Sequence, residues 1–109
     1  MIPDGVTAAL AEYKTGLQRA FGDRLVRAVL FGSYARGVVH EESDVDVLVL
    51  LSARRPKDGH RAVDVAVEVM LRQPEVVLSP LVLTTEELAA LRTRERQLAR
   101  DIDAQGVAL

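Results

Sequence analysis

Two aspartates stand one residue apart at the head of an apolar segment, in Asp44-Val45-Asp46 followed by VLVLL. In a β-strand such residues point to the same face, roughly 6.5 to 7 Å apart along the backbone. Two bare carboxylates there would repel each other, and burial would raise the pKa of at least one. A hard divalent cation relieves both effects, and Mg²⁺ prefers one or two carboxylates together with substrate phosphates. Asp44 and Asp46 are therefore predicted to bind metal beside a phosphate-bearing substrate.

A second polar segment, Gly32-Ser33, directly follows the apolar run LVRAVLF and is separated from Asp44 by ten residues. A helical turn starting at Ser33 would aim free backbone N–H groups at an anion, and the Ser33 hydroxyl adds one more donor. Gly32 would let a phosphate approach the main chain closely. Arg36 is a further candidate for a phosphate contact, with pairing to a nearby carboxylate as the alternative. If the two flanking strands are neighbours, these phosphate donors face the metal-binding carboxylates.

The elements that must position these residues follow from hydrophobic periodicity and turn signals. Helices are predicted over 1–22, 60–73 and 84–102, and strands over 24–31, 43–52 and 75–83, with a short terminal strand at 107–109 as an option. Because 43–52 is apolar on both faces after Asp46, it is predicted to be a central strand covered on both sides. The order indicates an α/β or α+β domain, with a small mixed sheet of three to four strands and helices packed on it.

Several local signals support these bounds. Asp4 and Gly22 are predicted to begin and end the first helix, and Thr84 with Glu87 forms a capping box for the last one. Pro80 indicates that 75–83 is an edge strand or carries a bulge. The second helix, whose Val-rich composition leaves a strand as the alternative, is predicted to bury one stripe made of Val63, Ala66, Val67, Met70 and Leu71.

Composition narrows the class of protein. The 109 residues fit one domain, 1–109, and the sequence is 49% hydrophobic and 28% charged. The chain has no cysteine, which excludes disulfides, thiolate metal sites and a cysteine nucleophile. Its formal net charge of -2 provides no general attraction for a nucleic-acid backbone. The absence of a membrane-length apolar run and of a signal-peptide pattern predicts a cytoplasmic protein with no membrane partner.

The two motifs together resemble a known signature. Gly32-Ser33, ten residues and then Asp44-Val45-Asp46 is similar to the motif of the DNA polymerase β-like nucleotidyltransferase superfamily, and "GSYARG" in a short chain is similar to its minimal nucleotidyltransferase branch. From ordinary residue frequencies, such a spaced match arises by chance in roughly one chain per thousand of this length. Its position between two predicted strands makes chance agreement rarer still.

The resemblance implies a reaction, cofactors and a partner. A nucleoside monophosphate, expected to be AMP from ATP, would move to a hydroxyl of a protein or small molecule, and pyrophosphate would be released. Gly32, Ser33 and Arg36 would bind the nucleotide phosphates, and Asp44 and Asp46 would hold two Mg²⁺ ions. Proteins of this branch often act in toxin–antitoxin modules, so a helical HEPN-type partner or a homo-oligomer is expected.

The sequence departs from the family pattern at the third carboxylate, which usually lies on the strand after the intervening helix. In 75–83 the positions in phase on one face are Glu75, Val77, Ser79 and Leu81, so the interior of the strand offers a serine. Glu75, at the edge of the strand, is the candidate third catalytic acid. Without such an acid, one metal site is weakened and the general base is missing.

Two functions are consistent with these residues. The first is the Mg²⁺-dependent nucleotidyltransferase just described. The second is a catalytically impaired nucleotide-binding or partner-masking module of the same fold, which the missing acid favours. A subunit whose active site is completed by another chain is a third, weaker reading. The other Asp-x-Asp, Asp101 and Asp103, falls in a predicted helix, where residues two apart do not share a face.

Overall fold

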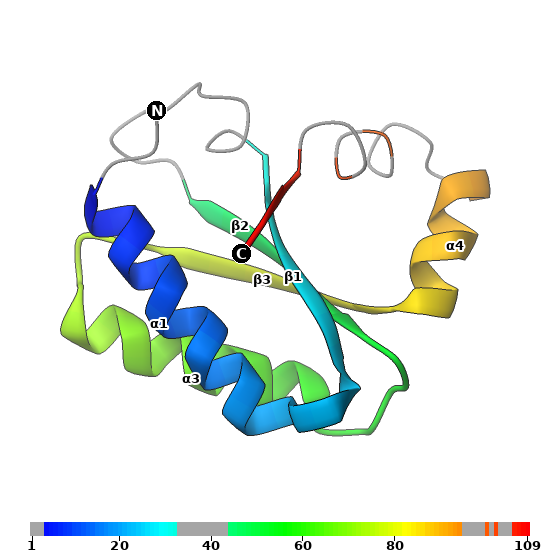
Figure 1. Ribbon diagram of the computed structural model, residues 1–109, viewed down its shortest axis with the longest axis horizontal. Coiled ribbons are helices and arrows are strands. Elements are labelled where there is room, and N and C mark those ends of the chain that lie inside the picture. The colour runs from blue at the N-terminus through cyan, green and yellow to red at the C-terminus, as the bar shows by residue number, and fades with distance from the viewer. Residues whose placement is uncertain (1–3, 33–43, 95–99, 101, 103–105) are drawn as a thin grey trace.

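The centre of the fold is a sheet with the strand order β3-β2-β1-β4 (Figure 1). The computed structural model describes residues 4–32, 44–94, 100, 102 and 106–109, and all elements below lie within these ranges. Strand β1 (Leu25–Phe31) runs antiparallel to β2 (Val45–Leu51) and to β4 (Val107–Ala108). Strand β3 (Leu78–Thr84) runs parallel to β2. The prediction of a small mixed sheet with β1 and β2 as neighbours is confirmed.

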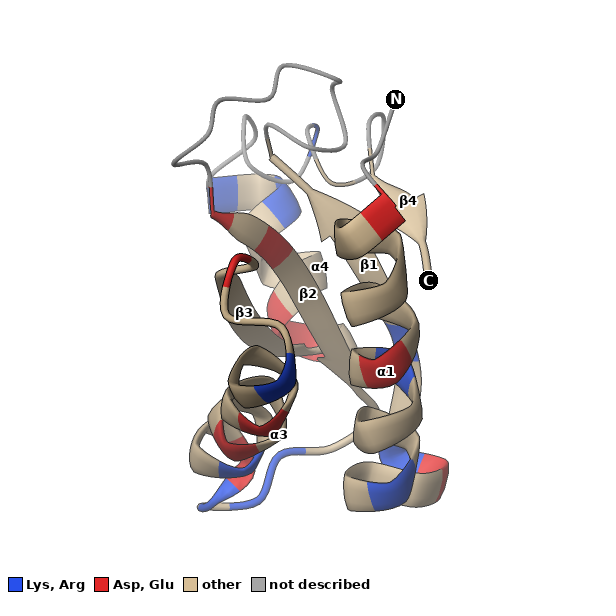
Figure 2. Ribbon diagram, turned by 90° about the vertical axis from the view of Figure 1, so that its left-hand side faces the viewer, with Lys and Arg blue, Asp and Glu red and all other residues tan. Residues whose placement is uncertain are grey.

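Helices cover both faces of this sheet (Figure 2). Helix α1 (Asp4–Phe21), followed by the short 3₁₀ turn η1 (Gly22–Arg24), packs with α3 (Asp58–Arg72) on one face. Helix α4 (Thr85–Arg94) lies on the other face, where Leu88 and Ile102 contribute to a second, smaller core. The predicted order of helix, strand, strand, helix, strand and helix is therefore confirmed. None of the described helices is long and apolar enough to cross a membrane.

The predicted helix signals act as expected. The apolar positions of α1 that the 3.6-residue period selects are all buried: Val6, Leu10, Tyr13, Leu17 and Phe21. The helix ends at Gly22, which has a φ of 57° that a residue with a Cβ adopts only at a cost. At the start of α4 the Thr84 Oγ1 accepts from the Glu87 N–H at 3.1 Å, and the Glu87 carboxylate accepts from the Thr84 N–H at 3.1 Å. This reciprocal pair is the predicted capping box.

Strand β2 is buried on both faces, as its continuous apolar run predicts. Val45, Val47 and Val49 point into the core under α1 and α3. Leu48 and Leu50 point into the core under α4. The alternation assigns every even-numbered residue of β2, including Asp46, to the α4 face of the sheet.

The predicted buried stripe of α3 is wrong in part. The helix buries Ala62, Ala66 and Val69, whereas Val63 and Val67 are 48% and 42% exposed and Leu71 is 77% exposed. The small alanines allow a close approach to α1, where the Tyr13 hydroxyl donates to the Ala62 carbonyl at 3.0 Å. Val65 packs so closely against Gly16 of α1 that a Cβ at Gly16 would collide with it. Close helix packing through small residues thus turns the larger side chains outward.

A buried ion pair fixes the start of α3 to the turn η1 that follows α1. The Arg24 guanidinium donates to both carboxylate oxygens of Asp58, at 2.7 and 2.9 Å, and the Arg55 N–H donates to the same carboxylate at 2.7 Å. The hydrogen bonds from Arg24 lower the pKa of Asp58 to about 2, against the opposing effect of burial. The connection between β2 and α3 is therefore held from two sides.

Candidate functional site

Asp46 lies between two neighbouring strands at one end of the sheet. Its Cα is paired with Phe31 of β1 on one side and with Ser79 of β3 on the other. Residues paired in this way share a face, and Phe31 and Leu81 belong to the core on the α4 face. The half-buried Asp46 carboxylate and the Ser79 side chain are therefore neighbours on the α4 face, at the end of the sheet where β2 begins.

Gly32 brings the two sequence motifs into contact. It follows the last residue of β1 and has a φ of 77°. A Cβ at this position would collide with the Oδ2 atom of Asp46 and would stand 3.3 Å from its Cγ atom. Glycine is thus required here both for the backbone conformation and for the space that the carboxylate occupies. The sequence indicates the glycine, but its contact with Asp46 becomes evident only in the folded chain.

The donor atoms at this end of the sheet suit a hard cation. Asp44 precedes β2 directly and is exposed, and Asp46 and Ser79 follow as described. These side chains offer only oxygen donors, which Mg²⁺ prefers. Within the described residues no three His, Cys, Asp or Glu side chains are grouped so that they could hold a metal ion. The donors therefore fit a cation that completes its shell with water and substrate phosphate oxygens.

The candidate third acid, Glu75, does not join this group. Strand β3 begins at Leu78, three residues later than predicted, because Gln73 to Val76 form a turn closed by a Val76 N–H to Gln73 carbonyl hydrogen bond of 3.1 Å. Strand alternation therefore does not extend back to Glu75. Its exposed carboxylate lies beside the first turn of α1, with Oε1 3.7 Å from the place of a Cβ on Gly5. The role of Glu75 as a ligand stays a prediction without this geometric support.

Ser33 and Arg36, the other predicted phosphate contacts, lie outside the described residues. In the structure Gly32 lies against Asp46, and Asp44 lies at the same end of the sheet. Ser79 is the residue of β3 that is paired with Asp46. The sequence marks Ser79 as the interior position of the strand where the family pattern leads one to expect an acid. Ser79 lies next to Asp46 because β2 and β3 pair in parallel, and no local sequence signal specifies this pairing.

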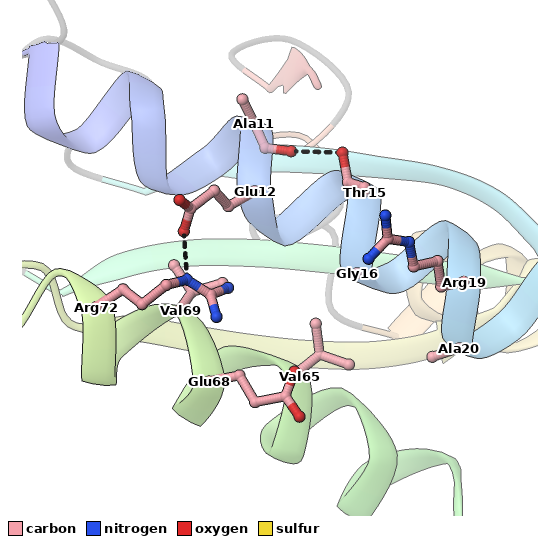
Figure 3. A pocket seen from close by; sticks show the side chains of 10 residues that line it. All are labelled: Ala11, Glu12, Thr15, Gly16, Arg19, Ala20, Val65, Glu68, Val69 and Arg72. Atoms are coloured by element: carbon pink, nitrogen blue, oxygen red, sulfur yellow. Dashed lines mark hydrogen bonds and ion pairs between the residues drawn. The ribbon is translucent and has the colours of Figure 1, made fainter.

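A hollow of about 720 Å³ lies elsewhere, between the outer sides of α1 and α3 (Figure 3). Its walls combine small and apolar side chains with charged ones, and Arg72 pairs with Glu12 across it at 3.3 Å. Helices α1 and α3 cover the face of the sheet opposite to Asp46. This hollow is therefore separate from the candidate site.

Comparison with known proteins identifies the family. Residues 10–103 match the model of the nucleotidyltransferase domain. The proposed protein adenylyltransferase MJ0141 of Methanocaldococcus jannaschii is 36% identical over 74 residues, which cover 67% of this chain and 74% of that protein. A second protein of the same organism, named in the same way as MJ1305, is 36% identical over 83 residues, which cover 73% of this chain and 56% of that protein.

Solved structures have the same fold. A toxin–antitoxin structure with AMP-PNP has a TM-score of 0.59 at 23% identity and matches 88% of this chain and 68% of that one. A MntA–HpeT toxin–antitoxin variant with two aspartate-to-glutamate changes has a TM-score of 0.58 at 22% identity, over 84% of this chain and 65% of that one. The chain thus spans about two thirds of these solved chains. It belongs to the nucleotidyltransferase domain family, as its motif predicts.

Proposed function

We propose that this nucleotidyltransferase domain uses Mg²⁺ to transfer AMP from ATP to a hydroxyl group of a protein. The observation that carries the proposal is the contact of Gly32 with Asp46, because it joins the phosphate-binding motif to the carboxylate motif at one end of the sheet. The protein acceptor is supported by the relatives named as proposed protein adenylyltransferases. ATP as the donor is supported by the same names and by the fold neighbour with AMP-PNP.

In the proposed reaction the acceptor hydroxyl oxygen attacks the α-phosphorus of ATP. A new phosphorus–oxygen bond forms, the bond to the β-phosphate oxygen breaks, pyrophosphate leaves, and the hydroxyl proton passes to a base. Bound Mg²⁺ would supply charge neutralisation for the phosphates. Asp44 and Asp46 would hold the cation, and Gly32 would keep the main chain open to the triphosphate. The positioning of donor and acceptor by these residues supplies most of the catalysis in such reactions.

A second function, masking of a protein partner without catalysis, is favoured by Ser79. This residue is level with Asp46 in the sheet, where the family pattern leads one to expect a carboxylate. A hydroxyl cannot replace a carboxylate as a metal-neutralising ligand or as a base near neutral pH. The fold neighbours are toxin–antitoxin proteins, so an antitoxin role with a HEPN-type helical toxin fits either function.

One experiment separates the two functions. The protein is incubated with Mg²⁺, each of the four ribonucleoside triphosphates in turn, and the product of the adjacent gene, and every protein is then weighed by intact-mass spectrometry. The proposal expects a mass gain of one adenylate on the acceptor with ATP, and none with Asp46→Asn. Neutralisation of the partner that survives the double change Asp44→Asn and Asp46→Asn, without any mass gain, would establish the masking function instead.

A further inference from the structure

Helix α3 is apolar on its outer side as well as on its inner side. Val63, Val67 and Leu71 follow one another at four-residue spacing and are 48%, 42% and 77% exposed. Residues four apart lie on the same line of a helix, so these side chains form one continuous outer stripe. A helix that is apolar on opposite sides normally buries both of them. We propose that the outer stripe of α3 is the docking surface for an amphipathic helix of a protein partner that carries basic residues beside its apolar stripe.

A hollow extends the stripe at one end. It has a volume of about 520 Å³ and lies between the N-terminal part of α3 and strand β3, with Val63, Pro80 and Val82 among its lining residues. The stripe alone is small beside the roughly 800 Å² that each partner buries in a stable interface. The hollow adds room for a large apolar anchor of the partner, of the kind that dominates binding energy at interfaces.

The neighbouring edge of β3 is poorly suited to a strand as the occupant. Because the Val45 N–H donates to the Val77 carbonyl, the even-numbered residues of β3 turn their backbone groups away from β2. Pro80 has no N–H to offer on that side, the Leu78 N–H donates to the Met70 sulfur at 3.4 Å, and the Val82 carbonyl accepts from Arg54 at 3.0 Å. With these groups committed, a partner strand finds only an interrupted ladder. A partner that binds through side chains fits this face better.

Charge on the outer side of α3 selects a basic helix. Asp64 and Glu68 are exposed and stand three residues before Val67 and Leu71, which places each carboxylate next to the apolar stripe. The two arginines of α3 are directed toward α1: Arg61 donates to the Ala20 carbonyl and Arg72 pairs with Glu12. Arg54, which lines the hollow, pairs with Glu87. A second copy of this chain docked through the same face would set Asp64 and Glu68 against the same two carboxylates of its partner. A helix with lysines or arginines beside its apolar stripe complements the surface.

The surface also has a defined relation to the candidate site. Leu71 lies in the last turn of α3, from which the chain leads through the turn at 73–76 into β3 and Ser79. A helix that lies along the stripe therefore extends toward the end of the sheet where Asp46 is found. This inference concerns a binding surface outside the catalytic residues, so it stands or falls independently of the proposed transfer reaction.

Two matched peptides test the proposal. Each is a helix of about 18 residues with leucines at four-residue spacing, one with lysines and one with glutamates beside the leucines. Binding to the full chain is measured by isothermal titration calorimetry and by amide chemical-shift changes. The lysine peptide should bind with shifts centred on Val63, Val67 and Leu71, at least about tenfold more tightly than the glutamate peptide. Absence of binding at about 1 mM, or equal binding of both peptides, would overturn the proposal.

Variants of the chain complete the test. The double change Val67→Ser and Leu71→Ser removes apolar surface without adding charge and should weaken the lysine peptide about tenfold. Val26→Ser, at a site in β1 that is 49% exposed, is the matched control and should leave binding unchanged. Replacing Asp64 and Glu68 with lysine should reverse the preference toward the glutamate peptide. If the wild-type chain instead forms dimers by sedimentation that the double serine change abolishes, a second copy is the occupant and the proposal fails.

Discussion

Replacing Gly32 with alanine should damage the candidate site far more than it damages the fold. A residue with a Cβ at a φ of 77° costs about 1 kcal/mol, which for a domain of this size lowers the melting temperature by about 4 to 8 °C. The added methyl group also stands 3.5 Å from Cβ and 3.3 Å from Cγ of Asp46 and collides with its carboxylate oxygen. The carboxylate must rotate or shift. A displacement of about 1 Å at a reacting centre costs about a hundredfold in rate.

Gly22 supplies the matched control. It also has a positive φ, of 57°, but a Cβ there would meet no atom within 4 Å. Gly22→Ala should therefore lower the melting temperature by a similar amount and leave nucleotide transfer unchanged. Both variants are measured by thermal unfolding and by ATP-dependent mass gain of the acceptor, at a temperature where both are folded. Equal transfer by the two alanine variants would refute the argument that the Gly32–Asp46 contact organises the site.

Three further changes probe the site and the fold. Asp46→Asn should reduce transfer by about a hundredfold or more while the melting temperature changes by less than about 4 °C; an active Asp46→Asn protein would contradict the metal-binding role. Ser79→Asp should lower the melting temperature in the absence of metal, because the new carboxylate is repelled by that of Asp46. It should also increase the rise in melting temperature that Mg²⁺ produces. An equal rise with Mg²⁺ in the wild type and the variant would refute the proximity of residue 79 to Asp46. Asp58→Asn removes a group whose pKa is lowered to about 2 by Arg24. The stabilisation from a lowered pKa is present above the unfolded value of about 4 and is lost as the pH falls toward about 2. The stability deficit of Asp58→Asn, measured by urea unfolding, should therefore shrink between about pH 4 and about pH 2. A deficit that does not change with pH would contradict this role of Asp58.

The elements of this chain are largely readable from its sequence, because local patterns determine them. The apolar period of α1, the capping box of Thr84 and Glu87, and the two-sided apolar run of β2 each specify an element on their own. Helix α3 is different. Its valines and alanines satisfy a helical stripe in more than one orientation, and the choice is made by the small residues that let it approach α1 closely. Such a choice depends on a partner distant in the sequence, so local periodicity selects a stripe that is correct at Ala66 and Met70 and wrong at Val63, Val67 and Leu71.

The candidate site can likewise be recognised only in part from the sequence. The spacing of Gly32 and Asp46 marks both residues in the sequence, and their types indicate phosphate and metal binding. Glu75 stays a prediction: counting alternate residues back from Leu81 assumes a continuous strand, but the turn from Gln73 to Val76 precedes β3. The proton acceptor for the attacking hydroxyl is therefore not identified by strand alternation, and Glu75 has to be tested by its own substitution.

The pairing of β2 with β3 gives the two proposed functions different requirements. With Ser79 level with Asp46, the described part of the site has one carboxylate on β2, a second directly before it at Asp44, and a neutral hydroxyl on β3. The neutral Ser79 leaves less negative charge for a second cation than a third carboxylate would. A single cation bound together with the triphosphate needs only Asp44 and Asp46. Nucleotide binding is thus less demanding at this site than transfer, because transfer also needs a group that accepts the hydroxyl proton. An acceptor protein that brings its own carboxylate would remove this difference, so addition of the partner should raise transfer much more than it raises affinity for ATP.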